Sequence, residues 1–272
     1  MRRAVLLLLA AFAVAGCGGG SSLSFDPVAS AATTSDAGSA KVAFDTTIDV
    51  GGNNARMTGD GKVDFRNRAA SMRFDVGDLL RGSGLPATAN EQWTIITQGL
   101  VVYMNAPTLS RQLPGGKPWL KLDVEKLAKS QNVNLGQFRQ LTQNDPTQVL
   151  DYLRAASGKI EKVGTEDVRG VSTTHYRATV DLDKVADQAP ANLRKTFRAS
   201  IRSLKQGLGR DKIPVDVWVD DQDLVRRLAE HLTIAGGGKI DFAVDFYDFG
   251  TPVSVSPPPA SQTLDLATVL GG

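Results

Sequence analysis

Residues 41–76 read KVAFDTTIDV GGNNARMTGD GKVDFRNRAA SMRFDV, and this stretch decides the fold. Apolar and polar residues alternate in three runs, which are separated by the turn residues Gly51 to Asn54 and by Asn67-Arg68. Alternation with a period of two is typical of strands that bury one face. We therefore predict three consecutive antiparallel strands with one apolar and one very polar face.

The same alternation recurs along the chain and predicts strands over 93–97, 100–105, 119–123, 160–168, 171–181, 213–220, 224–235 and 239–249. A helix is expected to begin at Asp26, with Pro27 in its first turn, and to end before Gly38. Further helices are predicted over 124–131, 135–141, 147–156 and 191–208. Since helices interrupt the strands rather than alternate with them, the predicted class is α+β: a large curved antiparallel sheet, a half-barrel, whose helices cover its concave apolar face.

A concave apolar face must be filled, either by helices or by a hydrophobic ligand. The inward positions of the strands are the candidate lining of a lipid cavity, and the alternative is a filled core. The candidates are Phe44, Ile48, Val63, Phe65, Met72, Phe74, Val102, Met104, Val217, Val219, Phe242, Val244 and Phe246.

The start of the chain has the order of a secretory signal peptide, with Arg2 and Arg3 before an apolar run. Residues 14–17 read Val-Ala-Gly-Cys and resemble a bacterial lipobox, with Cys17 the single cysteine of 272 residues. That resemblance implies cleavage before Cys17, its alkylation with diacylglycerol, and a lipid-anchored protein on the outer face of the cytoplasmic membrane. The alternatives are a plain signal peptide and a short membrane anchor, although the apolar run is about half the ~20 residues of a span.

The expected organisation is a signal peptide over 1–16, the lipidated cysteine and a Gly/Ser-rich tether over 17–25, one domain over 26–250, and a Pro-rich tail over 251–272. Of the 31 basic residues, two lie in the signal peptide, so the mature chain has as many basic as acidic residues, 29 of each. A neutral chain with 6% aromatic residues lacks the basic balance of a nucleic-acid binder. We expect no nucleic-acid partner and a monomer.

Motifs of the common enzyme classes do not occur in the sequence. Ser83 is not in a G-x-S-x-G motif, and Gly238-Lys239 lacks the remainder of a phosphate-binding loop. His175 and His231 have no metal-binding spacing, so both are expected to be ordinary sheet residues. No catalytic residue, metal or cofactor is predicted, and a hydrolase with a nonstandard site is the minor alternative.

The predicted helix over 191–208 is strongly basic. Its cations could contact anionic lipid headgroups at a membrane or in a ligand, while the alternative is a solvated helix face. The candidates are Arg194, Lys195, Arg198, Arg202 and Lys205.

Four stretches together resemble the actinobacterial LppX/LprA/LprF/LprG lipoprotein family. They are PWLKLD (118–123), DPTQVLDYL (145–153), GTEDVRGVSTTHYRATVDLDKV (164–185) and IPVDVWVDDQDLVRRL (213–228). The resemblance implies a fold like that of the LolA/LolB carriers, a half-barrel closed by helices over a lipid-sized cavity. It also implies an acylated lipid or glycolipid as ligand and a role in moving it outward, with a membrane transporter as a possible partner. The alternative is a structural or interaction lipoprotein with a filled core.

Overall fold

The computed structural model describes residues 27–50, 52–82, 91–111, 115–126, 160–188 and 194–266. Two compact units share these residues. Unit 1 holds the described residues of Ala37–Gln143 and Phe246–Gly272, and unit 2 holds those of Arg2–Asp36 and Asn144–Asp245. The predicted signal peptide, tether and Cys17 lie outside the described residues, as do the helices predicted over 135–141 and 147–156 and most of the one over 124–131.

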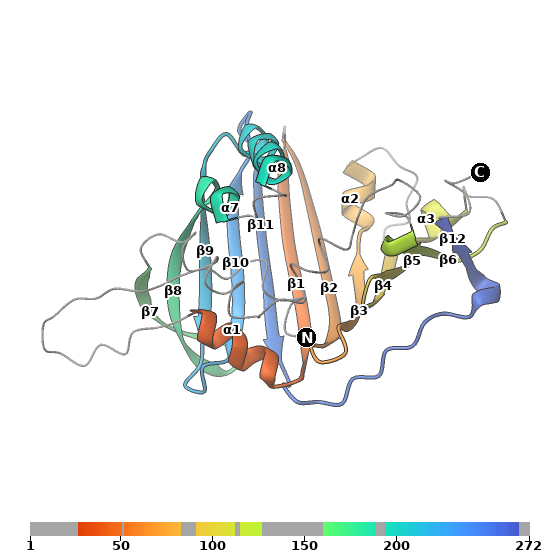
Figure 1. The fold of residues 1–272 in the computed structure, drawn as a ribbon, viewed down its shortest axis with the longest axis horizontal. Helices are drawn as coiled ribbons and strands as arrows, with labels where there is room; N and C mark the ends of the chain where they lie inside the picture. The colour runs from red at the N-terminus through yellow and green to blue at the C-terminus, as the bar shows by residue number, and fades with distance from the viewer. Residues whose placement is uncertain are drawn as a thin grey trace, which may run out of the picture. The chain divides into compact units, whose positions relative to one another are not determined.

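Unit 1 is built around a meander of six antiparallel strands (Figure 1). Its strands are β1 (Ser39–Val50), β2 (Asn53–Asp64), β3 (Ala69–Asp75), β4 (Gln92–Gln98), β5 (Val101–Asn105) and β6 (Trp119–Asp123). Two short helices follow strands of this meander, α2 (Gly77–Gly82) after β3 and α3 (Pro107–Ser110) after β5. The three strands predicted from residues 41–76 are therefore confirmed. No helix was predicted between residues 105 and 119, so α3 was missed.

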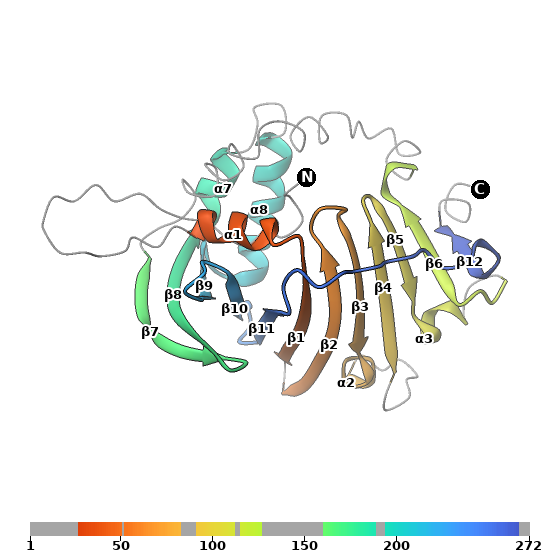
Figure 2. The same cartoon turned by 90° about the horizontal axis from the view of Figure 1, so that it is seen from below.

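The segment after Gly250 crosses the strands of unit 1 in extended form (Figure 2). Its backbone accepts hydrogen bonds from the side chains of Ser39 and Gln98, at Thr251 O and Val255 O respectively. A turn of 3-10 helix, η2 (Ala260–Gln262), then leads into β12 (Thr263–Asp265), which pairs with β6 in parallel. The sequence predicted an extended Pro-rich tail here but not this strand.

Unit 2 contains an antiparallel sheet in the order β11-β10-β9-β8-β7. Its strands are β7 (Glu161–Val168), β8 (Val171–Asp181), β9 (Lys212–Val219), β10 (Val225–Thr233) and β11 (Lys239–Tyr247), the last of which ends in unit 1. Arg169 and Gly170, both with positive φ, form the predicted two-residue turn between β7 and β8. The N–H of Gly170 donates to the carboxylate of Asp167 at 2.7 Å and closes this turn.

The described helices of unit 2 are α1 (Pro27–Asp36), α7 (Leu182–Gln188) and α8 (Arg194–Leu208), and Figure 2 shows all three on one side of β7–β10. The hydroxyl of Thr34 in α1 donates to Ser30 O and accepts the N–H of Val225, which joins α1 to the start of β10. Ala235, just beyond the end of β10, donates its N–H to Gly207 O of α8. Helix α8 ends at Leu208, and Gly209 after it, with a φ of 66° and its N–H donated to Lys205 O, forms a left-handed cap.

The predicted α+β class with a large antiparallel sheet is confirmed, and the described residues hold few helices beside it. No element was predicted between residues 181 and 191, so helix α7 is an addition. Within the described ranges, no helix combines the length and the apolar character that a membrane span needs.

Candidate functional site: the apolar sheet faces

The strand register of unit 1 collects apolar side chains on one face. Gly59 of β2 lies opposite Phe44 of β1 and Phe74 of β3, and residues paired across strands share a face of the sheet. The same rule extends across β4, β5 and β6. The larger residues on this face are Val42, Phe44, Ile48, Met57, Val63, Met72, Phe74, Trp93, Ile95, Val102, Met104, Leu120 and Leu122.

Two aromatic rings meet over β2 because Gly59 has no side chain. The centroids of Phe44 and Phe74 lie 5.4 Å apart, with the rings inclined by 46°. A Cβ at Gly59 would lie 2.5 Å from the carbonyl oxygen of Arg73 and 2.8 Å from Cδ1 of Phe74, and a Cβ at Gly61 would lie 2.5 Å from Ser71 O. Both glycines therefore allow an approach of β2 and β3 that no larger residue permits.

The register brings seven of the candidate residues to this one face, and Phe65 follows β2 two positions after Val63. The seven are Phe44, Ile48, Val63, Met72, Phe74, Val102 and Met104. Phe65, directly after β2, is buried, while the other seven are half-buried. The face is thus apolar and partly accessible. Sequence reasoning omitted Trp93, Ile95, Leu120 and Leu122 from the candidates, although the alternation of β4 and β6 points to them.

Unit 2 also has one apolar sheet face. On β9, Val215 and Val217 lie opposite Glu230 and Leu228 of β10, which in turn lie opposite Phe242 and Val244 of β11. The predicted candidates Val217, Val219, Phe242 and Val244 fall on this face, because residues two apart along a strand share a face, and of these only Phe242 is half-buried rather than buried. The fifth candidate of these strands, Phe246, is buried and lies at the end of β11 that belongs to unit 1. Leu228 and Glu230 also lie on this face and were not among the candidates.

The opposite face of unit 2 carries a network of hydrogen bonds around Trp218. His175 stacks on Trp218, with centroids 4.1 Å apart and an interplanar angle of 13°. Nδ1 of His175 lies 2.9 Å from Glu166 Oε1, and Nε2 lies 2.6 Å from Oδ1 of Asp216, which is buried. Hydrogen bonds from Trp218 and His175 lower the pKa of Glu166. Arg177 adds an ion pair to Asp216 at 2.8 Å.

This arrangement bears on the hydrolase alternative. A histidine that activates a hydroxyl or thiol needs one ring nitrogen for the nucleophile. Both ring nitrogens of His175 contact carboxylates, so in this structure neither nitrogen is directed at a hydroxyl or thiol. His231 is exposed and contacts Asp241 at 2.6 Å. No group of three or more metal-ligating side chains occurs within the described residues.

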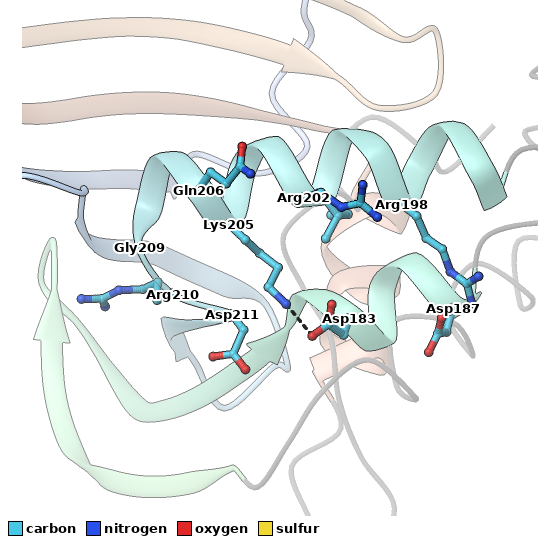
Figure 3. A pocket seen from close by; sticks show the side chains of 10 residues that line it. Asp183, Asp187, Arg198, Arg202, Lys205, Gln206, Gly209, Arg210 and Asp211 are labelled. Atoms are coloured by element: carbon cyan, nitrogen blue, oxygen red, sulfur yellow. Dashed lines mark hydrogen bonds and ion pairs between the residues drawn. The ribbon is translucent and has the colours of Figure 1, made fainter.

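The basic helix α8 and the short helix α7 border a pocket of about 610 Å³ (Figure 3). Lys205 forms an ion pair with Asp183 at 2.6 Å, and Arg198 forms one with Asp187 at 2.8 Å. The pocket is lined by Asp183, Asp187, Arg198, Ile201, Arg202, Lys205, Gln206, Gly209, Arg210 and Asp211.

These ion pairs divide the five predicted headgroup candidates into two groups. The charges of Arg198 and Lys205 are each balanced by an aspartate of α7. Within the described part of the chain, Lys195 and Arg202 are exposed and form no ion pair, and Arg194 is half-buried. The basic cluster is therefore less cationic than its sequence indicates.

Comparison with curated proteins finds two bacterial relatives, whereas no family model matches the chain. An uncharacterized 31.2 kDa protein of Streptomyces griseus is 33% identical over 57% of this chain and 50% of its own length. A Streptomyces coelicolor protein, whose name describes it as a candidate lipoprotein, is 27% identical over 57% of this chain and 45% of its own. The chain spans about half the length of the curated relatives it matches.

Among solved structures, the chain is similar to the lipoprotein LppX of Mycobacterium tuberculosis, at 17% identity and a TM-score of 0.47, over 84% of this chain and 97% of that one. It is also similar to LprF from Mycobacterium bovis, at 16% identity and a TM-score of 0.40, over 84% and 94% of the two chains. Both names occur in the family that the four sequence stretches resemble.

Proposed function

We propose that this protein is a non-catalytic lipoprotein of the cell envelope that binds an acylated lipid or glycolipid against its apolar sheet faces and assists its transport or presentation. One observation carries the proposal: seven apolar side chains on one face of β1–β5, from Phe44 to Met104, are half-buried rather than buried. A filled core would bury such residues more completely.

The energetics favour this use of the surface. Removing an acyl chain from water is worth about 0.8 kcal/mol per methylene, which is on the order of 10 kcal/mol for a chain of ordinary length. Contact with Phe, Met, Ile and Val side chains supplies this free energy without a chemical step. No cofactor or metal is needed for it.

The anchor follows from the lipobox. Cys17, lipidated after cleavage, would hold the protein at the outer face of the cytoplasmic membrane, where a membrane transporter could supply or receive the lipid. Arg194, Lys195, Arg198, Arg202 and Lys205 would contact anionic headgroups. Lys195 and Arg202 would contribute most, because aspartates of α7 balance Arg198 and Lys205 whereas Lys195 and Arg202 form no ion pair with a described residue.

Lipid binding is tested with the full chain carrying Cys17→Ser, which removes the acylation site. We expect native mass spectrometry and organic extraction of the purified protein to detect bound acyl lipid. An extract without lipid, together with no thermal shift on addition of lipid, would refute the proposal.

Two neighbouring residues of β3 provide matched variants, because Arg73 and Phe74 point to opposite faces of the sheet. Phe74→Asn places an amide on the apolar face and should reduce the bound lipid several-fold. Arg73→Asn makes the same replacement on the polar face and should leave the bound lipid unchanged. Equal losses in the two variants would contradict the assignment of the face.

A further inference from the structure

Glu230 is an acidic residue among apolar neighbours. It lies on the apolar face of unit 2, opposite Val215 of β9 and Phe242 of β11, with Leu228 and Leu232 on either side of it along β10. Its side chain is buried, with 9% of the residue exposed. Period-two alternation brings this carboxyl group to the same face as the leucines.

The carboxyl group has no partner among the described residues. Its Oε1 atom is buried and forms no hydrogen bond, and burial raises the pKa of Glu230 above its ordinary value. A buried polar atom without a partner costs folding free energy, so each such atom calls for an explanation.

Thr46 Oγ1 is another buried side-chain atom without a hydrogen-bond partner in the described ranges. Thr46 is paired with Met57, so it lies on the apolar face of unit 1. Both unsatisfied atoms thus occur on faces proposed to bind lipid. The polar faces, by contrast, satisfy their buried charges, as Asp216 and Asp245 illustrate.

Glu230 is also placed where β10 is held at both ends. Thr34 of α1 bonds to Val225, and Gly207 of α8 bonds to Ala235. Glu230 lies five positions from Val225 and five from Ala235, or about 16 Å in extended backbone. The carboxyl group therefore lies midway between the two helix attachments.

We propose that Glu230 is a ligand-binding residue, whose carboxyl group forms a hydrogen bond with an uncharged oxygen, an ester carbonyl or a hydroxyl, of the bound acyl lipid. This inference rests on the proposed lipid-binding function and specifies the ligand chemistry at one point. An anionic phosphate is disfavoured at this position, because the four strand residues around Glu230 that the structure describes, Val215, Leu228, Leu232 and Phe242, carry no positive charge to offset it. The ligand so defined has the chemistry of an acylglycerol or an ester-linked glycolipid.

The test uses two probes with the full chain carrying Cys17→Ser. Diphenylhexatriene, a fluorescent hydrocarbon without oxygen, reports binding to the apolar surface. Monoolein, which has one ester and two hydroxyl groups, displaces it and reports the polar contact. Glu230→Leu should leave the affinity for diphenylhexatriene within about twofold and weaken monoolein binding by about 3- to 10-fold, the value of one hydrogen bond.

Glu230→Gln keeps a donor and an acceptor in the same volume, so it should bind monoolein within about threefold of the unsubstituted chain. His231→Leu, at the next residue of β10 and on the opposite face, serves as the control and should change neither affinity.

Equal monoolein affinity in Glu230→Leu and the unsubstituted chain would overturn the inference while leaving the proposed function intact. So would a parallel loss of both probes in Glu230→Leu, or a Glu230→Gln variant as weak as Glu230→Leu. Failure of the unsubstituted chain to bind either probe would instead refute the proposed function.

Discussion

Replacing Gly59 with alanine should disturb the apolar face of unit 1 at its centre. The added Cβ would lie 2.5 Å from the carbonyl oxygen of Arg73 and 2.8 Å from Cδ1 of Phe74. Phe74 can rotate, but the carbonyl belongs to the backbone of β3, so the two strands must separate. Overpacking of this kind typically costs about 1–3 kcal/mol.

Urea denaturation of Gly59→Ala should therefore show a free energy of unfolding lower by about 1–3 kcal/mol, with Tm lower by about 2–4 °C per kcal/mol. Gly164→Ala in β7 is the matched control, because a Cβ there meets no atom within 4 Å. Alanine restricts the unfolded chain more than glycine, so this control should be neutral or stabilising by up to about 1 kcal/mol.

The double variant Gly59→Ala/Phe74→Ala separates the two contacts. It removes the ring but not the carbonyl of Arg73, so the strain of the added Cβ should persist in the background of Phe74→Ala. A Gly59→Ala variant as stable as the unsubstituted chain, or a double variant in which the cost of Gly59→Ala disappears, would refute the reasoning.

The remaining predictions concern charges. Burial raises the pKa of Glu230, so this group favours the folded state at pH values below its ordinary pKa of 4.5 and opposes folding as the pH rises through the raised pKa of the folded state. In urea denaturation, the gain in free energy of unfolding from Glu230→Gln should therefore grow from pH 4 to pH 8. A gain that does not depend on pH would contradict the burial of the carboxyl group. His175→Ala should lower the free energy of unfolding by about 2–3 kcal/mol, because two carboxylates lose a hydrogen-bond partner, whereas a loss below 0.5 kcal/mol by the same assay would count against the network. In sedimentation with anionic vesicles, Arg202→Glu should weaken binding more than Arg198→Glu, since Asp187 already balances Arg198; the reverse order would exclude the proposed role of α8.

The strands could be predicted because apolar and polar residues alternate along them. For Trp119–Asp123 and Val171–Asp181 the predicted and observed bounds agree. The alternation in β1–β3 also placed Phe44, Met72 and Phe74 on one face, as the register of these strands shows. Strand β12 could not be predicted, because three residues carry no measurable period and its partner β6 is about 140 positions away in the sequence. Pro107 at the start of α3 was an available signal for a helix that was missed.

Charged residues were harder to interpret than apolar ones. The sequence of α8 gives its cations but not their partners, since Asp183 and Asp187 come from a helix that was not predicted. Since residues two apart along a strand share a face, the sequence could have placed Glu230 on the apolar face together with Leu228 and Leu232. Its lack of a partner, however, depends on the strands that flank it and emerges only from the three-dimensional structure.

The central claim is that acyl chains contact the apolar sheet faces. It is tested most directly with a monoacylglycerol that carries a photoreactive diazirine in its acyl chain, crosslinked to the full chain bearing Cys17→Ser and mapped by mass spectrometry. We predict crosslinks at apolar-face residues such as Phe44, Met72, Phe74, Met104 and Phe242. Crosslinks confined to the polar faces or to the pocket between α7 and α8 would contradict the claim.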